Sequence, residues 1–413
     1  MSFFFVLAII FLLLWDYRKA IIIIAPFKLF FFSLAIGNLP LTSVVSIVSA
    51  FFFFGRSTHK DKSFPLTLSF VLLAFSILCS NLHGGFHIKN AIFQISDYLL
   101  YIYMLYYCIC DRKDIILLFR SCNVFMLLVL CNGFYEFYTL GTNILRDIII
   151  GYSKKGSYFT ENSLCDRGYR TCSIYGHSIT YGMMVITMAY LYLFFLKGIA
   201  FSFNKMIFFV LMLTTVFLTN SRTPLLGLII YSLPFLLEMK SSGYIRIYIF
   251  CIVMSVLYLG GNYIGKSFES IFYSEENDMG GSSIEMRILQ FEGVMAAISE
   301  NIWFGRGAVV GWEEIRNKYY ILGGESIVFQ VLLRQGIIGI VIYIFFFFEV
   351  IKASLRNYYF KYIVILAVGW FVMQFSTSTI DISDYPMLLA FVIYYKIGIF
   401  KQNEEIVHNH SCI

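Results

Sequence analysis

Charged side chains are scarce in this sequence. Only 14% of the 413 residues are Asp, Glu, Lys or Arg, whereas 59% are hydrophobic and 19% are aromatic. Soluble globular domains average about 25% charged and about 45–50% apolar residues, so this chain has more apolar surface than a water-soluble globule can cover. The shortage of charge excludes a soluble enzyme and predicts an all-α, polytopic integral membrane protein.

Other features that the sequence lacks narrow the kind of membrane protein. The N-terminus lacks a basic first segment and a small-residue cleavage site, so we expect it to be retained and not removed as a signal peptide. The chain has no internal repeat, which argues against a transporter built from repeated halves. Of nine scattered cysteines, only Cys165 and Cys172 fall in an expected outer loop. Their spacing permits a disulfide if that compartment is oxidising. The alternative is that both remain unpaired thiols.

Long apolar runs dominate the chain. A hydrocarbon core needs about 20 apolar residues per helical span. We predict thirteen spans, or twelve if the short first three merge or are re-entrant, near residues 3–15, 20–36, 39–54, 64–81, 91–109, 114–139, 173–196, 206–219, 225–239, 245–260, 326–350, 359–376 and 385–400.

Basic residues set the expected orientation. The connections on one side and the tail carry sixteen lysines and arginines, whereas the short connections opposite carry two, Lys89 and Arg222. The basic side is expected to be cytoplasmic. The chain then divides into N-terminal spans (1–139), an extracytoplasmic loop (140–172), central spans (173–260), a long extracytoplasmic loop (261–325), C-terminal spans (326–400) and a cytoplasmic tail (401–413).

One arginine interrupts the apolar run at 206–239. As a single helix, these 34 residues would extend roughly 50 Å, which exceeds a hydrocarbon core of about 30 Å. The run is therefore expected to form two helices. The segment Asn220–Pro224 forms the turn, because Ser, Thr and Asn suit helix caps and Pro fits a first helical turn. Arg222 then lies at the outer mouth, where it either faces a cavity or anchors to lipid head groups.

The two expected outer loops add ionisable residues at the same face. The segment "GSSIEMRILQFEGVMAAISE" has capping-box spacing and places Ile284, Ile288, Phe291, Met295 and Ile298 on one face of an amphipathic helix that carries Arg287. Guanidinium groups bind phosphate oxygens bidentately and stay charged. An anionic, lipid-linked ligand is therefore expected near a group at or close to the outer ends of spans: Arg170, His177, Arg222, Arg287, Arg306 and Glu325.

Three segments occur in a characteristic order: "FLTNSRTPLLGLII", "MRILQFEGVMAAISENIWFGRG" and "GGESIVFQVLLRQGIIG". Over about residues 165–345, this order resembles the signature region of the O-antigen polymerase and O-antigen ligase superfamily. Two departures are visible. Glu325 stands where the ligases place a histidine, which favours a polymerase, and the proline often found after the position of His177 is missing.

The resemblance implies a GT-C-like membrane glycosyltransferase. In such an enzyme Glu325 would be the general base, Arg222 and Arg287 would stabilise the leaving pyrophosphate, and four residues would bind substrate: Arg170, His177, Arg306 and Arg334. Neither a metal nor another cofactor is expected, since the chain contains no D-x-D pair of the kind that binds a metal ion for nucleotide sugars.

The resemblance also implies partners and a location. Donor and acceptor would be undecaprenyl-pyrophosphate-linked oligosaccharides, joined into O-antigen or a related surface polysaccharide at the periplasmic face of the bacterial inner membrane. The lipid bilayer and a chain-length regulator are expected partners, and nucleic acid is not. Two alternatives remain: an O-antigen ligase that transfers glycan to lipid A-core, and a flippase or transporter for lipid-linked sugars.

Overall fold

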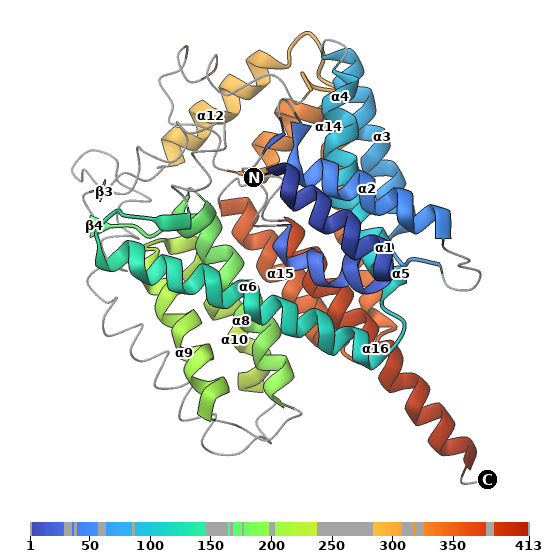
Figure 1. Ribbon diagram of the computed structural model, residues 1–413. Helices are drawn as coiled ribbons and strands as arrows, with labels where there is room; N and C mark the ends of the chain where they lie inside the picture. The colour runs from blue at the N-terminus through green and yellow to red at the C-terminus, as the bar shows by residue number, and fades with distance from the viewer. Residues whose placement is uncertain are drawn as a thin grey trace.

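The protein is a bundle of α-helices with two short pairs of strands, as the computed structural model shows (Figure 1). The strands pair antiparallel, Ala35–Ile36 (β1) with Leu39–Pro40 (β2) and Leu164–Cys165 (β3) with Gly168–Tyr169 (β4). The structure describes residues 2–28, 35–36, 39–56, 63–84, 87–145, 164–165, 168–175, 177–197, 203–237, 284–307, 315, 318, 326–376 and 384–411.

The helices follow the apolar runs of the sequence. The first third contains α1 (Ser2–Phe27), α2 (Leu41–Arg56), α3 (Thr67–His83), α4 (Ile88–Gln94), the π-helix η2 (Ile95–Leu100), α5 (Tyr101–Cys108) and α6 (Arg112–Tyr138). The remainder contains the 3₁₀ turn η4 (Ser173–Tyr175), α8 (Ser178–Lys197), α9 (Phe203–Leu218), α10 (Arg222–Leu237), α12 (Ile284–Ala297), α14 (Ile327–Leu355), α15 (Phe360–Ser376) and α16 (Asp384–Ser411).

Some boundaries differ from the expected spans. The run at 3–15 and the first part of the run at 20–36 lie in a single element, α1, whose two helical halves meet at a non-helical residue, Asp16. Residues 35–36, at the end of the second run, belong to β1. Helix α16 continues through most of the expected tail to Ser411. The expected span at 245–260 and most of the two expected outer loops lie outside the described residues, so the predicted number of spans and the domain boundaries stay predictions.

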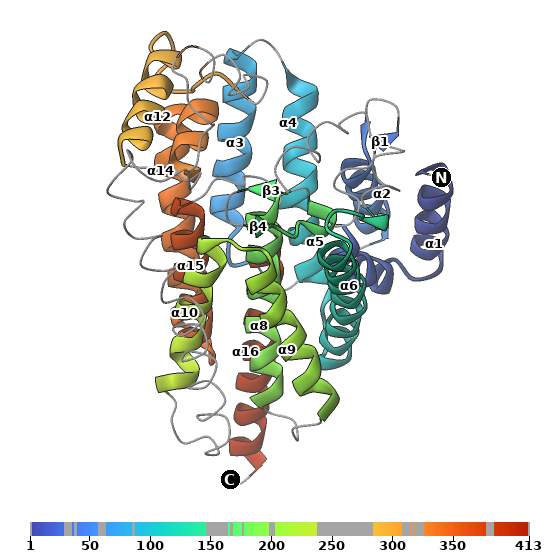
Figure 2. The same cartoon turned by 90° about the vertical axis from the view of Figure 1, so that its left-hand side faces the viewer.

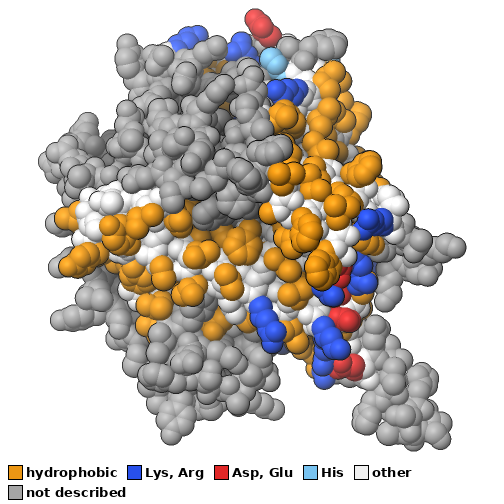
Figure 3. Space-filling model, in the orientation of Figure 1, with side chains coloured by type: hydrophobic (Ala, Val, Ile, Leu, Met, Phe, Trp, Pro, Cys, Tyr) orange, Lys and Arg blue, Asp and Glu red, His pale blue; other side chains and the backbone are white. Residues whose placement is uncertain are grey.

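Apolar side chains cover much of the described surface. Within the described residues, α6 and α14 are long and apolar enough to cross a bilayer, and shorter apolar helices include α2, α3 and α15. Phe51, Phe11 and Phe348 are 78%, 63% and 61% exposed. Figure 3 shows such side chains along α6, with charged side chains gathered where α6 begins beside α16. The predicted all-α membrane fold is therefore confirmed.

The helices have a consistent arrangement in two perpendicular views (Figures 1 and 2). Helix α12 lies beside α14 at the end of the bundle that also holds α3 and α4, and α16 leaves the bundle at the opposite end. Helix α14 packs against α3 and α15, while α10 packs between α8 and α15. Helix α15 therefore contacts both α10 and α14.

Four buried tyrosines connect α8, α10, α15 and α16. The rings of Tyr190 and Tyr231 stack with centroids 4.7 Å apart, and those of Tyr362 and Tyr394 stack at 6.3 Å. The Tyr190 hydroxyl donates to the carbonyl of Tyr362 (3.0 Å), and the Tyr394 hydroxyl donates to the carbonyl of Tyr190 (3.2 Å). Because apolar helices gain little from burial against one another in lipid, such interhelical contacts help to fix their positions.

Replacing Tyr190 with alanine should therefore destabilise this bundle. We expect Tyr190→Ala to lower the free energy of unfolding by about 3–5 kcal/mol, as for other buried aromatic truncations. The matched control is Tyr138→Ala, because the Tyr138 side chain is 87% exposed. Thermal unfolding in detergent should give a clearly lower melting temperature for the first variant only, and equal shifts would contradict the role of the cluster.

Candidate functional site

The expected turn at Arg222 is present between α9 and α10. Helix α9 ends at Leu218, Asn220 takes a left-handed conformation (φ 47°), and α10 begins at Arg222. Asparagine tolerates this conformation better than most residues. Pro224 lies in the first turn of α10 and packs on Gly182 of α8, where a Cβ atom would be 2.3 Å from the proline Cγ. The sequence thus fixes where α10 begins and how closely it approaches α8.

Arg170 reaches this turn from the segment before α8. Its Nη2 donates to the hydroxyl of Ser221 at 3.0 Å, and that hydroxyl lies 3.2 Å from the hydroxyl of Ser178. The amide of Thr171 donates to the carbonyl of Leu218 (3.2 Å), which fixes the backbone beside Arg170 to the end of α9. Ser221 directly precedes Arg222, so these contacts hold the guanidinium group of Arg170 at the residue before Arg222.

Arg287 reaches the same turn from α12. Its Nη2 donates to the carbonyl oxygen of Ser376 at the end of α15 (3.2 Å), and the hydroxyl of Ser376 lies 3.5 Å from that of Thr223. Thr223 directly follows Arg222. The structure therefore brings Arg170, Arg222 and Arg287 around the start of one helix, and we call these three residues the arginine cluster.

His177 lies in the connection that leads into α8, beside the arginine cluster. A neutral imidazole has one nitrogen that donates and one that accepts a hydrogen bond. The Nδ1 of His177 has no hydrogen-bond partner within the described part of the chain.

A buried carboxylate on α6 anchors the segment that carries Arg170. Glu136 is fully buried and accepts hydrogen bonds from the Tyr169 hydroxyl (2.8 Å), the Ser173 amide (2.6 Å) and the Asn143 side-chain amide (3.0 Å). The sequence marks Glu136 only as an ionisable residue inside an apolar run. It could not show these partners, because they lie in a loop 7–37 positions away.

A break in α14 explains the glycines of two sequence elements, F-G-R-G (304–307) and G-I-I-G (336–339). Gly336 has φ 65° and ψ −160°, a conformation that side-chain-bearing residues rarely adopt. A Cβ atom there would lie 2.4 Å from the carbonyl oxygen of Trp303. Residues 302–307 replace the interrupted helical bonds, since the amides of Arg306, Gly307, Ile337 and Ile338 donate to the carbonyls of Leu333, Arg334, Ile302 and Trp303, respectively, at 2.9–3.2 Å.

We call this backbone contact between residues 302–307 and the break in α14 the seam. It places the backbone of Arg306 beside that of Arg334. The contacts described above for the arginine cluster include neither residue. Arg306 follows Gly305, whose own φ is 67° and whose Cα packs against the break in α14. Arg334 lies two residues before Gly336 and lines a cavity between α3 and α14. The F-G-R-G and G-I-I-G elements are thus the two sides of one backbone contact.

Helix α12 joins the two arginine groups and divides its apolar side chains between protein and surface. Ile298 and Val294 are fully buried with Leu333, as is the polar side chain of Gln290. Ile288 and Phe291, which belong to the expected apolar face, are 52% and 47% exposed. In a membrane protein such side chains can face lipid, so apolar periodicity alone does not locate the protein core.

Other expected residues have no described geometry. Glu325 lies outside the described residues, immediately before Ser326, whose hydroxyl caps α14 by accepting from the Val328 amide (3.3 Å). Cys172 is buried. Within the described part of the chain, no group of three or more His, Cys, Asp or Glu side chains could hold a metal ion.

A comparison with known families identifies the central segment. Residues 207–344 match the O-antigen ligase family model. The matched segment runs from α9 into the middle of α14, and it includes Arg222, Arg287 and both sides of the seam. It supports the O-antigen ligase and polymerase superfamily and a function of that type, without separating the two activities. No curated protein matches the chain.

Substituting Gly336 should test the seam. In Gly336→Ala, the added Cβ would overlap the Trp303 carbonyl and strain the backbone, so we expect a loss of about 1–3 kcal/mol in stability. Gly55→Ala is the control, since a Cβ at Gly55 meets nothing within 4 Å. Thermal unfolding of both purified variants gives the comparison, and an unchanged melting temperature for Gly336→Ala would contradict the seam.

Proposed function

We propose that this protein is a polysaccharide polymerase that joins undecaprenyl-pyrophosphate-linked oligosaccharide repeat units into O-antigen or a related surface polysaccharide. The reaction would take place at the periplasmic face of the bacterial inner membrane. The observation that carries this proposal is the arginine cluster. Arg222 begins α10, Arg170 donates to the preceding Ser221, and Arg287 donates to Ser376, whose hydroxyl lies 3.5 Å from that of Thr223.

The cluster suits the leaving group of such a transfer. The acceptor hydroxyl oxygen bonds to the anomeric carbon of the growing chain as the bond from that carbon to the pyrophosphate oxygen breaks. Negative charge then develops on the departing lipid pyrophosphate. Arg222 and Arg287 would stabilise this charge as preorganised donors, and Arg170, held by Ser221, would bind a neighbouring phosphate oxygen. Fixed cations can supply this stabilisation without a metal ion.

The start of α10 supports anion binding independently of side-chain charge. The first amides of a helix have no intrahelical acceptor, and the helix dipole adds partial positive charge there. Arg222 is the first residue of α10, a helix of 16 residues. A phosphate near this end would therefore meet both a guanidinium group and unsatisfied amides.

Glu325 is proposed as the general base that takes the proton from the acceptor hydroxyl. It precedes the N-terminal half of α14, which ends at the break at Gly336. His177, beside the cluster, is proposed to hydrogen-bond substrate, and Arg306 and Arg334 are proposed to bind substrate at the seam. A chain-length regulator is proposed as a membrane partner.

A ligase is the second candidate function, because the matched family model is described as an O-antigen ligase. Glu325, at the position where ligases carry a histidine, favours the polymerase. A ligase requires lipid A-core as acceptor, and a flippase would form no new bond. Incubating the purified protein with a lipid-linked repeat unit separates the three: a ladder of chain lengths indicates a polymerase.

Arginine substitutions test the proposed site. We expect Arg222→Ala and Arg287→Ala each to reduce the rate of polymer formation by roughly 100-fold or more, the usual cost of removing one transition-state donor. Arg222→Lys should retain part of the activity, because it keeps the charge but loses bidentate geometry. The assay is the in vitro ladder, with equal amounts of folded protein.

The control is Arg120→Ala, since Arg120 is exposed and distant in sequence from the cluster. It should leave the ladder unchanged. A wild-type ladder from a well-folded Arg222→Ala protein would remove that residue from the site, and the same result for Glu325→Ala would remove the proposed base.

A further inference from the structure

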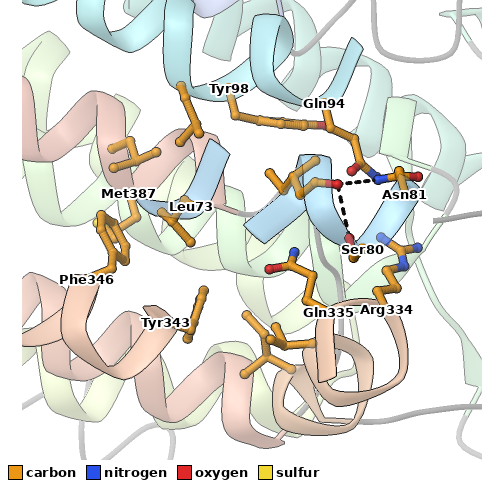
Figure 4. Close-up of a pocket in the computed structure, with 15 residues that line it drawn as sticks. Leu73, Ser80, Asn81, Gln94, Tyr98, Arg334, Gln335, Tyr343, Phe346 and Met387 are labelled. Atoms are coloured by element: carbon orange, nitrogen blue, oxygen red, sulfur yellow. Dashed lines mark hydrogen bonds between the residues drawn. The ribbon is translucent and has the colours of Figure 1, made fainter. Parts of the chain in front are cut away.

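A cavity of about 90 Å³ lies between α3, η2, α14 and the start of α16. The arginine cluster does not line it. Figure 4 shows that the walls divide by polarity. Polar side chains converge on one side, from Ser80, Asn81, Gln94, Arg334 and Gln335, and apolar or aromatic side chains form the other, including Leu73, Tyr98, Tyr343, Phe346 and Met387.

The polar side retains hydrogen-bonding capacity. Within the described part of the chain, the carboxamide of Gln94 has no hydrogen-bond partner. Gln335 uses only its Oε1, which accepts from the Ser76 hydroxyl at 2.9 Å. Its Nε2 can therefore donate to a ligand, and Gln94 can both donate and accept.

The kind of polar group indicates the kind of ligand. Four of the five polar side chains are uncharged and carry an acceptor oxygen. Phosphate oxygens only accept hydrogen bonds, so a phosphate would use the donors of this wall and leave its acceptor oxygens unpaired. A sugar hydroxyl both donates and accepts, which matches carboxamide and hydroxyl groups. The apolar side, which includes Tyr98, Tyr343 and Phe346, can cover the C–H face of a sugar ring.

The size of the cavity supports the same ligand. A volume of about 90 Å³ accommodates roughly six to nine water molecules at about 10–15 Å³ each. This is room for one sugar ring, and a polyprenyl or acyl chain is far longer. The setting also fits, because pockets that bind small ligands are mostly apolar with a few placed polar groups, and π-helical turns such as η2 occur frequently at functional sites.

We propose that this cavity binds one uncharged sugar ring, with Gln94 and Gln335 as its hydrogen-bonding residues. Resting on the proposed function, the ring belongs to the acceptor oligosaccharide. It is not the ring that reacts, because the reacting hydroxyl must reach the anomeric carbon next to the pyrophosphate at the arginine cluster. Sugar binding at this cavity can be measured without any transfer reaction, so the two proposals can fail separately.

The test is saturation-transfer NMR on the full-length protein in detergent. The probes are methyl glycosides of glucose, galactose, mannose, rhamnose, N-acetylglucosamine and N-acetylgalactosamine. At least one should receive saturation from the wild-type protein. Gln94→Leu should weaken its binding roughly tenfold through lost hydrogen bonds. Leu73→Phe, which fills the cavity without removing a polar group, should abolish it and supplies the test if Gln94→Leu does not fold.

Two controls separate this site from the rest of the protein. Gln402→Leu changes a glutamine whose Nε2 donates to the Arg356 carbonyl, far along α16 from the cavity, and should leave binding unchanged. Arg222→Ala should also retain sugar binding even when it forms no polymer. Saturation of no glycoside, binding that survives both cavity substitutions, or displacement of the glycoside by undecaprenyl phosphate at the cavity would each overturn the proposal.

Discussion

The arrangement of positive charge around the start of α10 is the constraint on which the account depends. Like charges repel, and the repulsion grows where water is scarce. Here the Ser221 hydroxyl accepts from Arg170 and the Ser376 carbonyl accepts from Arg287, so each contact orients a guanidinium group. The anion site that we propose depends on this geometry, to which α8, α9, α10, α12 and α15 contribute.

Two other features maintain this arrangement. Glu136 ties the segment before α8 to α6 through hydroxyl and backbone donors, so Arg170 approaches the turn from a fixed backbone. The seam at Gly336 holds residues 302–307 against α14, while α12, just before this loop, buries Ile298 against the same helix. A buried carboxylate and a glycine-dependent backbone contact thus determine where two of the arginines lie.

The sequence predicted the elements better than their contacts. Apolar runs located the helices, and the length of the run at 206–239 required the turn that places Arg222. The break at Gly336 was not predictable, because a glycine is tolerated in a regular helix and its partners here are backbone atoms of a distant loop. The apolar face expected for α12 did not show which of its residues pack on protein, since Ile298 is buried whereas Ile288 and Phe291 are exposed. Lipid-facing and core-facing positions look alike in an apolar sequence.

The most direct test of the central claim is a structure of the protein with undecaprenyl pyrophosphate bound. The account predicts the diphosphate at the start of α10, with phosphate oxygens within hydrogen-bond distance, about 2.7–2.9 Å, of the guanidinium groups of Arg222 and Arg287. A diphosphate bound elsewhere in the protein, with the arginine cluster empty, would contradict it.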